Sequence, residues 1–336
     1  MTRPGARRRV TVVVGTALML GMIVLATLSP ASAQKKPAGL SQSQPSGQTG
    51  DEVHLGTELV VLDVSVIDRA NRPVFDIPKD RFTVVEDGVP QTVDFFSKEL
   101  APVSLAIAID TSGSMRSKLE TVVQAVTNLV RTNRPKDETA VIQFKDTVEL
   151  LEEFTTDPSD VEDALGDLFA NGQTSLFDAI LLSSDYVQKD GHNRRKALIV
   201  VTDGVEKGSY YSLEEVVEKM RKLDVRLYLI GFTSDLDDSR GLFKRSQKSK
   251  AEKLLSKMAE ETGGRSFFPR EPSELGPIGE EIALDLRTVY AIGYYPTNTK
   301  KDGTYRTVNV GILGSAGKAD TNYTARTRSG YYAAKQ

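Results

Sequence analysis

The sequence contains no cysteine and only two histidines in its 336 residues. Without cysteine there is no attachment point for a lipoprotein anchor and no disulfide framework, and a chain of this length can bury a core that is stable without one. The histidines, His54 and His192, lie in segments without regular periodicity. Two histidines do not supply a histidine-based catalytic centre or a zinc site, so we expect both to be loop residues.

A strong excess of basic residues is also absent. The chain has 43 lysines and arginines against 46 aspartates and glutamates, which gives a formal net charge of −3. Part of the positive charge belongs to the extreme N-terminus, so the rest of the chain is more acidic than the total indicates. Nucleic acid is therefore not an expected partner.

One apolar run approaches the length that spans a bilayer, and it stands at the N-terminus. The run Val10–Leu28 follows four arginines and precedes Ala31-Ser32-Ala33. Basic residues, an apolar stretch and a small-residue A-x-A site predict a secretory signal peptide over residues 1–33, cleaved before Gln34. The alternative is an uncleaved segment that anchors the chain in the membrane. We expect an exported protein that is periplasmic, on the cell surface or extracellular.

The next segment, residues 34–56, is rich in Gln, Lys, Pro, Ser and Gly and is predicted to be a flexible linker. Residues 57–99 are predicted to form an N-terminal β segment. In it Glu58–Asp68 alternates apolar and polar residues, and Arg81–Glu86 and Val89–Phe96 flank the hairpin signal Asp87-Gly88.

Residues 297–336 form a matching C-terminal β segment, with predicted strands over Thr304–Leu313 and Thr321–Arg328. Neither segment has enough strands to be stable alone. We therefore predict that the two segments pair into one small β-sandwich, with a domain over residues 100–296 inserted between them.

Strands and helices alternate through residues 100–296, which is typical of an α/β fold with a doubly wound, mostly parallel, Rossmann-like sheet. The connection between Thr139–Phe144 and Val148–Phe154 is too short for a parallel crossover, so this pair is predicted to be antiparallel. A capping box, Ser212-Leu-Glu-Glu215, opens one helix, and Gly263-Gly264 ends another.

The most informative stretch of the chain is an apolar strand that leads into oxygen-bearing residues, Leu105-Ala-Ile-Ala-Ile-Asp110-Thr-Ser112-Gly-Ser114. One carboxylate and two hydroxyls stand at alternate positions, so their oxygens can converge on one small cation. Hard oxygen ligands suit Mg²⁺ or Mn²⁺ better than zinc or copper. Ser114 can alternatively cap the helix that follows.

Two later segments carry further oxygen donors. Thr174 lies in a glycine-bearing loop that opens a helix, and Asp203 follows the β-branched strand Lys196–Thr202. With these residues the chain resembles the von Willebrand factor type A (VWA) domain, whose metal-ion-dependent adhesion site (MIDAS) reads Asp-x-Ser-x-Ser, then Thr, then Asp. The resemblance assigns this site to Asp110, Ser112, Ser114, Thr174 and Asp203.

The likeness covers roughly residues 57–334 and is closest to a bacterial group of exported VWA-related proteins. The supporting stretches are Phe82–Gln91, Glu260–Phe268, Leu286–Pro296 and Arg328–Tyr331. It implies a secreted, non-enzymatic module for protein–protein interaction or cell adhesion. The resemblance implies that the bound ion is Mg²⁺, with Mn²⁺ or Ca²⁺ as alternatives. The ion would leave one coordination position open to an Asp or Glu of a protein partner.

Two other classes of protein remain. In the first, the chain is a scaffold or assembly factor of the cell envelope that acts through the β-sandwich, with a metal that is only structural. In the second, it is a metal-dependent phosphohydrolase of the haloacid dehalogenase type. Such enzymes need a second carboxylate two residues after the first, where this chain has Ser112, and no nucleophile elbow is present.

Overall fold

The computed structural model describes residues 58–99, 101–234 and 242–335. The predicted signal peptide and linker lie outside the described residues. Residues 57–336 contact one another closely enough to form one compact unit. This unit contains one six-stranded sheet and two four-stranded sheets.

The six-stranded sheet has the order β10-β9-β8-β5-β6-β7. Five strands are parallel, and the edge strand β7 is antiparallel to β6, which confirms the predicted reversed pair. Every residue of the central strand β5 is buried, as expected for a strand covered on both faces. The strands are β5 Val103–Asp110, β6 Glu138–Phe144, β7 Val148–Thr155, β8 Arg195–Thr202, β9 Arg226–Gly231 and β10 Arg265–Phe267.

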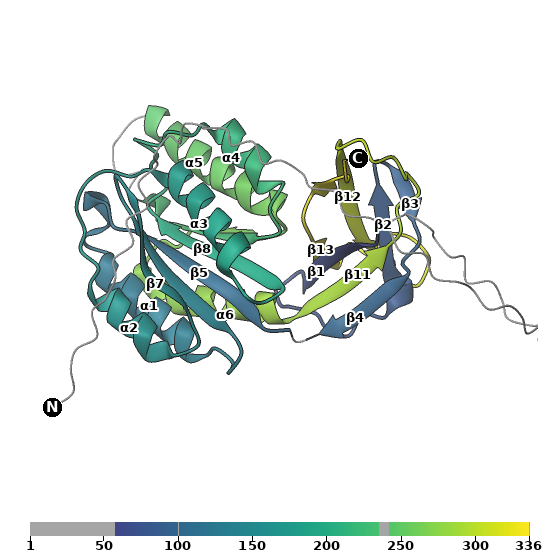
Figure 1. Cartoon of the computed structure of the whole chain (residues 1–336), viewed down its shortest axis with the longest axis horizontal. Coiled ribbons are helices and arrows are strands. Elements are labelled where there is room, and N and C mark those ends of the chain that lie inside the picture. Colours follow the sequence, from purple (N-terminus) through teal and green to yellow (C-terminus); the bar gives the residue numbers. More distant parts are fainter. Residues whose placement is uncertain (1–57, 100, 235–241, 336) are drawn as a thin grey trace, which may run out of the picture. The chain divides into compact units, whose positions relative to one another are not determined.

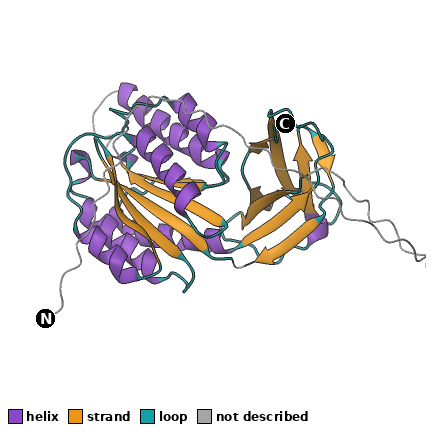
Figure 2. Cartoon of the chain, viewed as in Figure 1, coloured by secondary structure: helices purple, strands orange, loops and turns teal. Residues whose placement is uncertain are grey.

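Helices cover both faces of this sheet (Figures 1 and 2). One face packs against α1 (Leu119–Arg131), α2 (Pro158–Gly166) and α6 (Leu275–Arg287) through apolar side chains such as Val126 and Ile282. The other packs against α3 (Leu176–Asp190), α4 (Leu213–Met220) and α5 (Leu242–Glu261). The predicted doubly wound, mostly parallel α/β sheet is therefore confirmed.

Local signals fix several helix ends. The Ser212 side chain accepts a hydrogen bond from the Glu215 backbone, and the Glu215 carboxylate accepts one from the Ser212 backbone, so the capping box that opens α4 is confirmed. After α5, Gly263 has a φ of +75°, a left-handed conformation that glycine adopts without strain. The helix that follows the Asp110 loop begins at Leu119, after a 3₁₀ turn over Gly113–Met115.

The two ends of the described chain pair with each other in two antiparallel sheets, with orders β13-β1-β11-β4 and β14-β12-β2-β3. One shared core lies between them and includes Leu62, Val84, Tyr290 and Val310. This pairing confirms the predicted small β-sandwich. Its strands are β1 Val60–Asp68, β2 Phe82–Glu86, β3 Val89–Gln91, β4 Phe95–Glu99, β11 Val289–Tyr294, β12 Tyr305–Ile312, β13 Tyr323–Arg326 and β14 Gly330–Tyr332.

The structure differs from the prediction at two places. The single strand expected over Val89–Phe96 is two strands, because β3 pairs with β2 in one sheet whereas β4 pairs with β11 in the other. The strand Val289–Tyr294, placed in the inserted domain 100–296, pairs with β1 and β4 of the sandwich. Strand pairing thus puts the end of the inserted domain before β11, near Thr288, rather than at residue 296.

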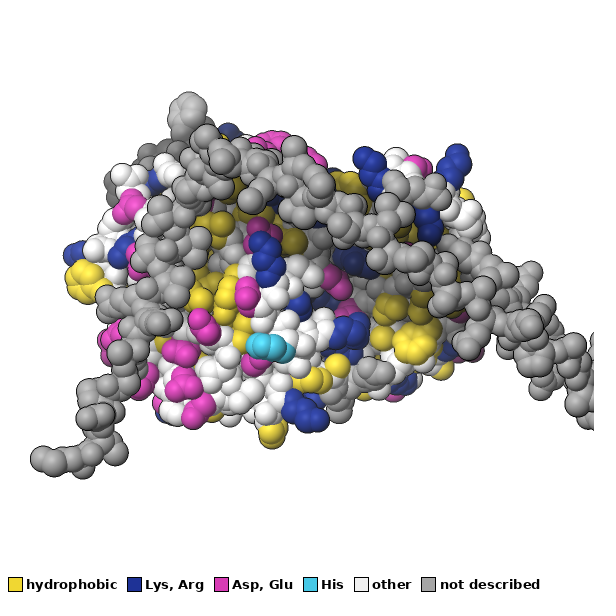
Figure 3. All heavy atoms as spheres, viewed as in Figure 1, with side chains coloured by type: hydrophobic (Ala, Val, Ile, Leu, Met, Phe, Trp, Pro, Cys, Tyr) yellow, Lys and Arg dark blue, Asp and Glu magenta, His cyan; other side chains and the backbone are white. Residues whose placement is uncertain are grey.

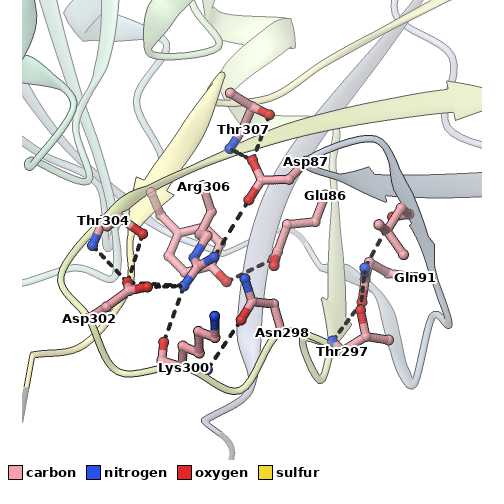
Figure 4. A network of polar contacts seen from close by, with 12 residues as sticks. Glu86, Asp87, Gln91, Thr297, Asn298, Lys300, Asp302, Thr304, Arg306 and Thr307 are labelled. Atoms are coloured by element: carbon pink, nitrogen blue, oxygen red, sulfur yellow. Dashed lines mark hydrogen bonds and ion pairs between the residues drawn. The ribbon is translucent and has the colours of Figure 1, made fainter.

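A polar network ties the two flanking segments together (Figure 4). The buried Glu86 carboxylate accepts hydrogen bonds of 2.8 Å from the hydroxyls of Tyr294 and Tyr331. Arg306 forms ion pairs with Asp302 at 3.0 Å and with Asp87 at 3.8 Å. Glu86 and Asp87 come from the N-terminal segment and their partners from residues after 288, so these contacts close the sandwich.

The charged surface has no single sign. Acidic and basic side chains are interspersed over the face seen in Figure 3. Among the described residues, no helix combines the length and the apolar character needed to cross a bilayer.

Candidate metal centre

The two predicted carboxylates lie at the carboxyl ends of neighbouring parallel strands. Asp110 is the last residue of β5, and Asp203 directly follows β8. The register pairs Ile109 with Val201, so both carboxylates emerge at the same edge of the sheet. Open α/β sheets bind ligands at this edge, because the loops that leave the strands meet there.

The first loop folds back on the Asp110 carboxylate. Oδ1 of Asp110 accepts a hydrogen bond of 2.9 Å from the Ser112 backbone N–H, and Oδ2 accepts one of 2.8 Å from the Thr202 hydroxyl. The hydroxyl oxygens of Ser112 and Ser114 lie 3.0 Å apart. Three of the predicted ligands are thus gathered within one turn of the chain.

The second loop, which carries Thr174, is held against the first by backbone hydrogen bonds. Gly113 N–H donates to Gly172 C=O at 3.1 Å, and Asn171 N–H donates to Thr111 C=O at 2.8 Å. Gly172 has a φ of +76°, and a Cβ there would overlap the Asp146 side chain, so glycine is needed at this point.

The third loop, which carries Asp203, is joined to the second in the same way, by a 3.1 Å hydrogen bond from Lys207 N–H to Thr174 C=O. The structure therefore brings all three loops together, as the sequence predicted. Four of the five side chains are buried: Asp110, Ser112, Thr174 and Asp203. Ser114 alone is exposed. Although Asp110 and Asp203 stand at a sheet edge, both are buried, because the three joined loops cover them.

Burial has a direct electrostatic consequence for Asp110. It raises the pKa of the Asp110 carboxyl to about 6, and the neighbouring charge of Asp203 acts in the same direction. Hydrogen bonds from Ser112 and Thr202 oppose this rise in pKa only in part. Two carboxylates held close together away from water are costly unless a cation lies between them.

The donor set fits a hard divalent cation. In the part of the chain that the structure describes, no group of three or more His, Cys, Asp or Glu side chains could hold a metal ion. A metal at this edge would therefore depend on hydroxyl oxygens together with two carboxylates. Such all-oxygen sites suit Mg²⁺ or Mn²⁺ rather than zinc or copper.

The sequence of this region matches one protein family. A profile for the von Willebrand factor type A domain matches residues 105–206, which include most of β5, all of β8 and all five predicted ligands. Residues 105–206 of this chain are therefore similar to von Willebrand factor type A domains. The match begins inside β5 and ends in the loop after Asp203, so it covers the part of the domain that carries the candidate metal centre.

Several solved structures resemble this chain at low sequence identity. A von Willebrand factor type A protein from Catenulispora acidiphila is 14% identical, with a TM-score of 0.46 over 84% of this chain and 75% of that chain. An aerotolerance-related membrane protein from Bacteroides fragilis is 17% identical and has a TM-score of 0.42. The match covers 55% of this chain and 98% of that chain.

The vWF domain of the type V pili tip protein Mfa5 from Porphyromonas gingivalis is 11% identical and has a TM-score of 0.43. The match covers 55% of this chain and 95% of that chain. No curated protein matches the chain in sequence. At these identities the structural similarities do not extend to function.

Two residues that support the candidate site, Thr202 and Glu206, were not among the predicted site residues. Thr202 donates to Asp110 and accepts a 3.1 Å hydrogen bond from Gly204 N–H, so its hydroxyl links the two aspartate loops. Glu206 accepts hydrogen bonds from the backbones of Gly208, Ser209 and Phe177, which fixes the third loop on the start of α3. The signal for Thr202 is its place next to Asp203. The contact of Glu206 with α3 has no such signal, because Phe177 is 29 residues away in sequence.

Proposed function

We propose that this chain is an exported, non-enzymatic protein-binding module that captures an Asp or Glu side chain of a partner through a divalent cation. Asp110, Ser112, Ser114, Thr174 and Asp203 would hold the ion, Mg²⁺ or Mn²⁺. The observation that carries the proposal is the convergence of three loops, joined by backbone hydrogen bonds, on one buried set of oxygens. Bound Mg²⁺ would supply an open coordination position for the partner's carboxylate oxygen.

The charges of the site favour an acidic ligand. Three of the five donors are neutral hydroxyls, so the chain brings at most two negative charges to a divalent cation. Both oxygens of Asp110 already accept hydrogen bonds, from Ser112 and Thr202, which spreads the charge of that carboxylate. A further carboxylate from a partner is therefore attracted rather than repelled.

The loops around the site present apolar surface that a partner can cover. Phe169 and Tyr210 are 66% and 87% exposed, the two most exposed large apolar side chains among the described residues. Phe169 lies between α2 and the Thr174 loop, and Tyr210 lies in the loop that follows Asp203. Exposed aromatic residues next to a charged anchor point are typical of protein-binding surfaces.

Metal binding is tested by replacing one exposed hydroxyl ligand. We expect Ser114→Ala to weaken Mg²⁺ binding by about tenfold, the effect of losing roughly 1.4 kcal/mol of ligand interaction. Ser114 is exposed, and its one side-chain contact is the Ser112 hydroxyl, so the fold is expected to persist. Calorimetric titration of the chain from Gln34 onward with Mg²⁺ and Mn²⁺ measures the change.

Ser117→Ala is the matched control, because Ser117 is also exposed and lies three residues further along the same loop. Its Mg²⁺ affinity is expected to equal that of the unmodified protein. Equal affinities for all three proteins would remove Ser114 from the site, and a lack of Mg²⁺ and Mn²⁺ binding by the unmodified protein would count against the proposal as a whole.

Partner recognition is tested with peptides displayed on phage, selected on the protein in Mg²⁺ and eluted with EDTA. The eluted peptides are expected to share an Asp or Glu. Phe169→Ala and Tyr210→Ala should each weaken binding of a selected peptide by about tenfold while Mg²⁺ affinity stays unchanged. Phe95→Ala, which alters an exposed aromatic residue of the sandwich, is the control. Loss of binding in Phe95→Ala alone would instead indicate a scaffold that acts through the sandwich.

A further inference from the structure

A small cavity lies at the opposite end of β8 and β9 from the candidate metal centre. It has a volume of about 40 Å³ and is lined by the first residues of both strands and by Asp63 of β1. Thr327, Arg328 and Gly330, near the C-terminus, complete this part of the wall. Its wall contains six basic residues: Arg194, Arg195, Lys196, Arg221, Arg226 and Arg328.

Only three acidic residues line the same cavity: Asp63, Asp224 and Glu261. The Glu261 carboxylate already accepts two hydrogen bonds from the Arg221 guanidinium, of 2.8 and 3.0 Å. Asp63 is shared, since its carboxylate lies 3.0 Å from Arg194 and 3.8 Å from Arg195.

The third acid, Asp224, is 70% exposed and lies 3.5 Å from Arg328, so water screens that pair. The lining thus has more positive than negative charge. Within this lining, Arg226 donates a hydrogen bond of 2.9 Å to the neutral backbone C=O of Asp63.

Arg226 is more than nine-tenths buried, and it stays charged. Burial disfavours the charge, but Tyr228, Asp285 and Asp63 more than offset this effect and raise the pKa of Arg226. Nη1 of Arg226 and Nε of Arg328 are buried and make no hydrogen bond to any residue that the structure describes. Buried guanidinium donors without an acceptor are rare, because the lost hydration costs free energy.

The size of the cavity limits what can supply the missing acceptors. About 40 Å³ holds a few water molecules or one small anion, but not a peptide or a lipid headgroup. Arg226 belongs to β9 and Arg328 to the segment after β13, so the two donors belong to different guanidinium groups and do not lie in one plane as the donors of a single arginine do. That arrangement suits a tetrahedral ion better than a flat carboxylate.

We propose that this cavity binds a small tetrahedral oxyanion, phosphate or sulfate, with Arg226 and Arg328 as its hydrogen-bond donors. The ion would accept hydrogen bonds from the two unsatisfied donors and offset the excess positive charge of the lining. Because β1, β9 and the C-terminal segment all contribute to the wall, the bound ion would also join elements that are far apart in the sequence.

The test is calorimetric titration of the chain from Gln34 onward with inorganic phosphate, without Mg²⁺ and at constant ionic strength. We expect one phosphate to bind per chain, sulfate to compete with it, and acetate not to compete. Arg328→Gln, in which the altered side chain is 26% exposed, should fold and bind phosphate at least about tenfold more weakly. Arg226→Met should abolish binding, provided that its circular dichroism spectrum shows a folded protein.

Arg131→Gln is the matched control. It removes an arginine of α1 that pairs with the Glu162 carboxylate of α2, away from the cavity, and its phosphate affinity should not change. Three results would overturn the proposal: a folded, unmodified protein that does not bind phosphate, an Arg328→Gln protein that binds it normally, or acetate that competes as well as sulfate.

Discussion

Replacing Asp110 by asparagine is expected to abolish Mg²⁺ binding and, at the same time, to make the metal-free protein more stable. In the metal-free protein, burial and the charge of Asp203 raise the pKa of Asp110 from 3.8 to about 6. A rise of this size means that keeping the carboxylate charged at neutral pH costs about 3 kcal/mol. Asparagine keeps the shape and can still accept from Ser112 N–H, so we expect a gain of about 1–3 kcal/mol in the free energy of unfolding.

The pH dependence of stability is a second test of whether the charged Asp110 destabilises the metal-free protein. The folded protein holds the Asp110 proton more tightly than the unfolded chain, so the contribution of this group to stability is greatest at low pH. It falls as the pH rises from about 4 to above about 6, through the two pKa values. Asp110→Asn should lack this fall. Thermal unfolding in EDTA across this range, compared between the two proteins, measures the difference.

Added Mg²⁺ distinguishes the proposed role of Asp110 as a metal ligand from its effect on the stability of the metal-free protein. It should raise the unfolding temperature of the unmodified protein, because it binds the folded state, and leave that of Asp110→Asn unchanged. Asp146→Asn, which alters a neighbouring carboxylate outside the predicted ligand set, is the control and should keep its response to Mg²⁺. If Asp110→Asn responded to Mg²⁺ as the unmodified protein does, Asp110 would not be a ligand.

Replacing Gly264 by alanine is expected to destabilise the fold by about 4 kcal/mol or more, or to prevent folding. A Cβ at this position would overlap the carbonyl oxygen of Leu227 and stand 2.7 Å from its carbonyl carbon. Both atoms belong to the backbone of β9, so no side-chain rotation can relieve the overlap. Strand β10, which begins at the next residue and pairs with β9, would have to move away.

Gly276→Ala is the matched control, because no atom lies within 4 Å of a Cβ placed there. Gly276 is in helix α6, where alanine is favoured over glycine by about 0.5–1 kcal/mol, so this variant should be as stable as the unmodified protein or slightly more stable. Urea unfolding measures both variants. A Gly264→Ala protein with an unchanged urea midpoint would show that β9 and β10 are not this close.

Much of the fold could be predicted from local signals. The Asp87-Gly88 hairpin forms as expected, with positive φ values of 48° and 82° at the two turn residues. The short Lys145–Thr147 connection implied an antiparallel β6–β7 pair, which the structure contains. Each of these features depends on a few neighbouring residues, and the physical constraint on them is therefore visible in the sequence.

The candidate site was predictable for a related reason. Asp110 and Asp203 each end an apolar strand, and parallel strands deliver their carboxyl ends to one edge of a sheet. The hydrogen bond from Thr202 to Asp110 and the one from Phe177 to Glu206 were not predictable, since each joins parts of the chain that are distant in sequence. The burial of Asp110 was missed as well, because it results from three loops that close over one another.

What the sequence by itself determined is therefore most of the strands and helices, the doubly wound order and which residues are proposed as oxygen donors. Only the tertiary structure decided which sheet β4 and β11 join, how deeply Asp110 is buried and that Arg226 and Arg328 face one cavity. The physical reason is the range of the interactions. Capping, turns and strand periodicity act over a few residues, whereas burial and charge balance depend on side chains that folding brings together from distant parts of the chain.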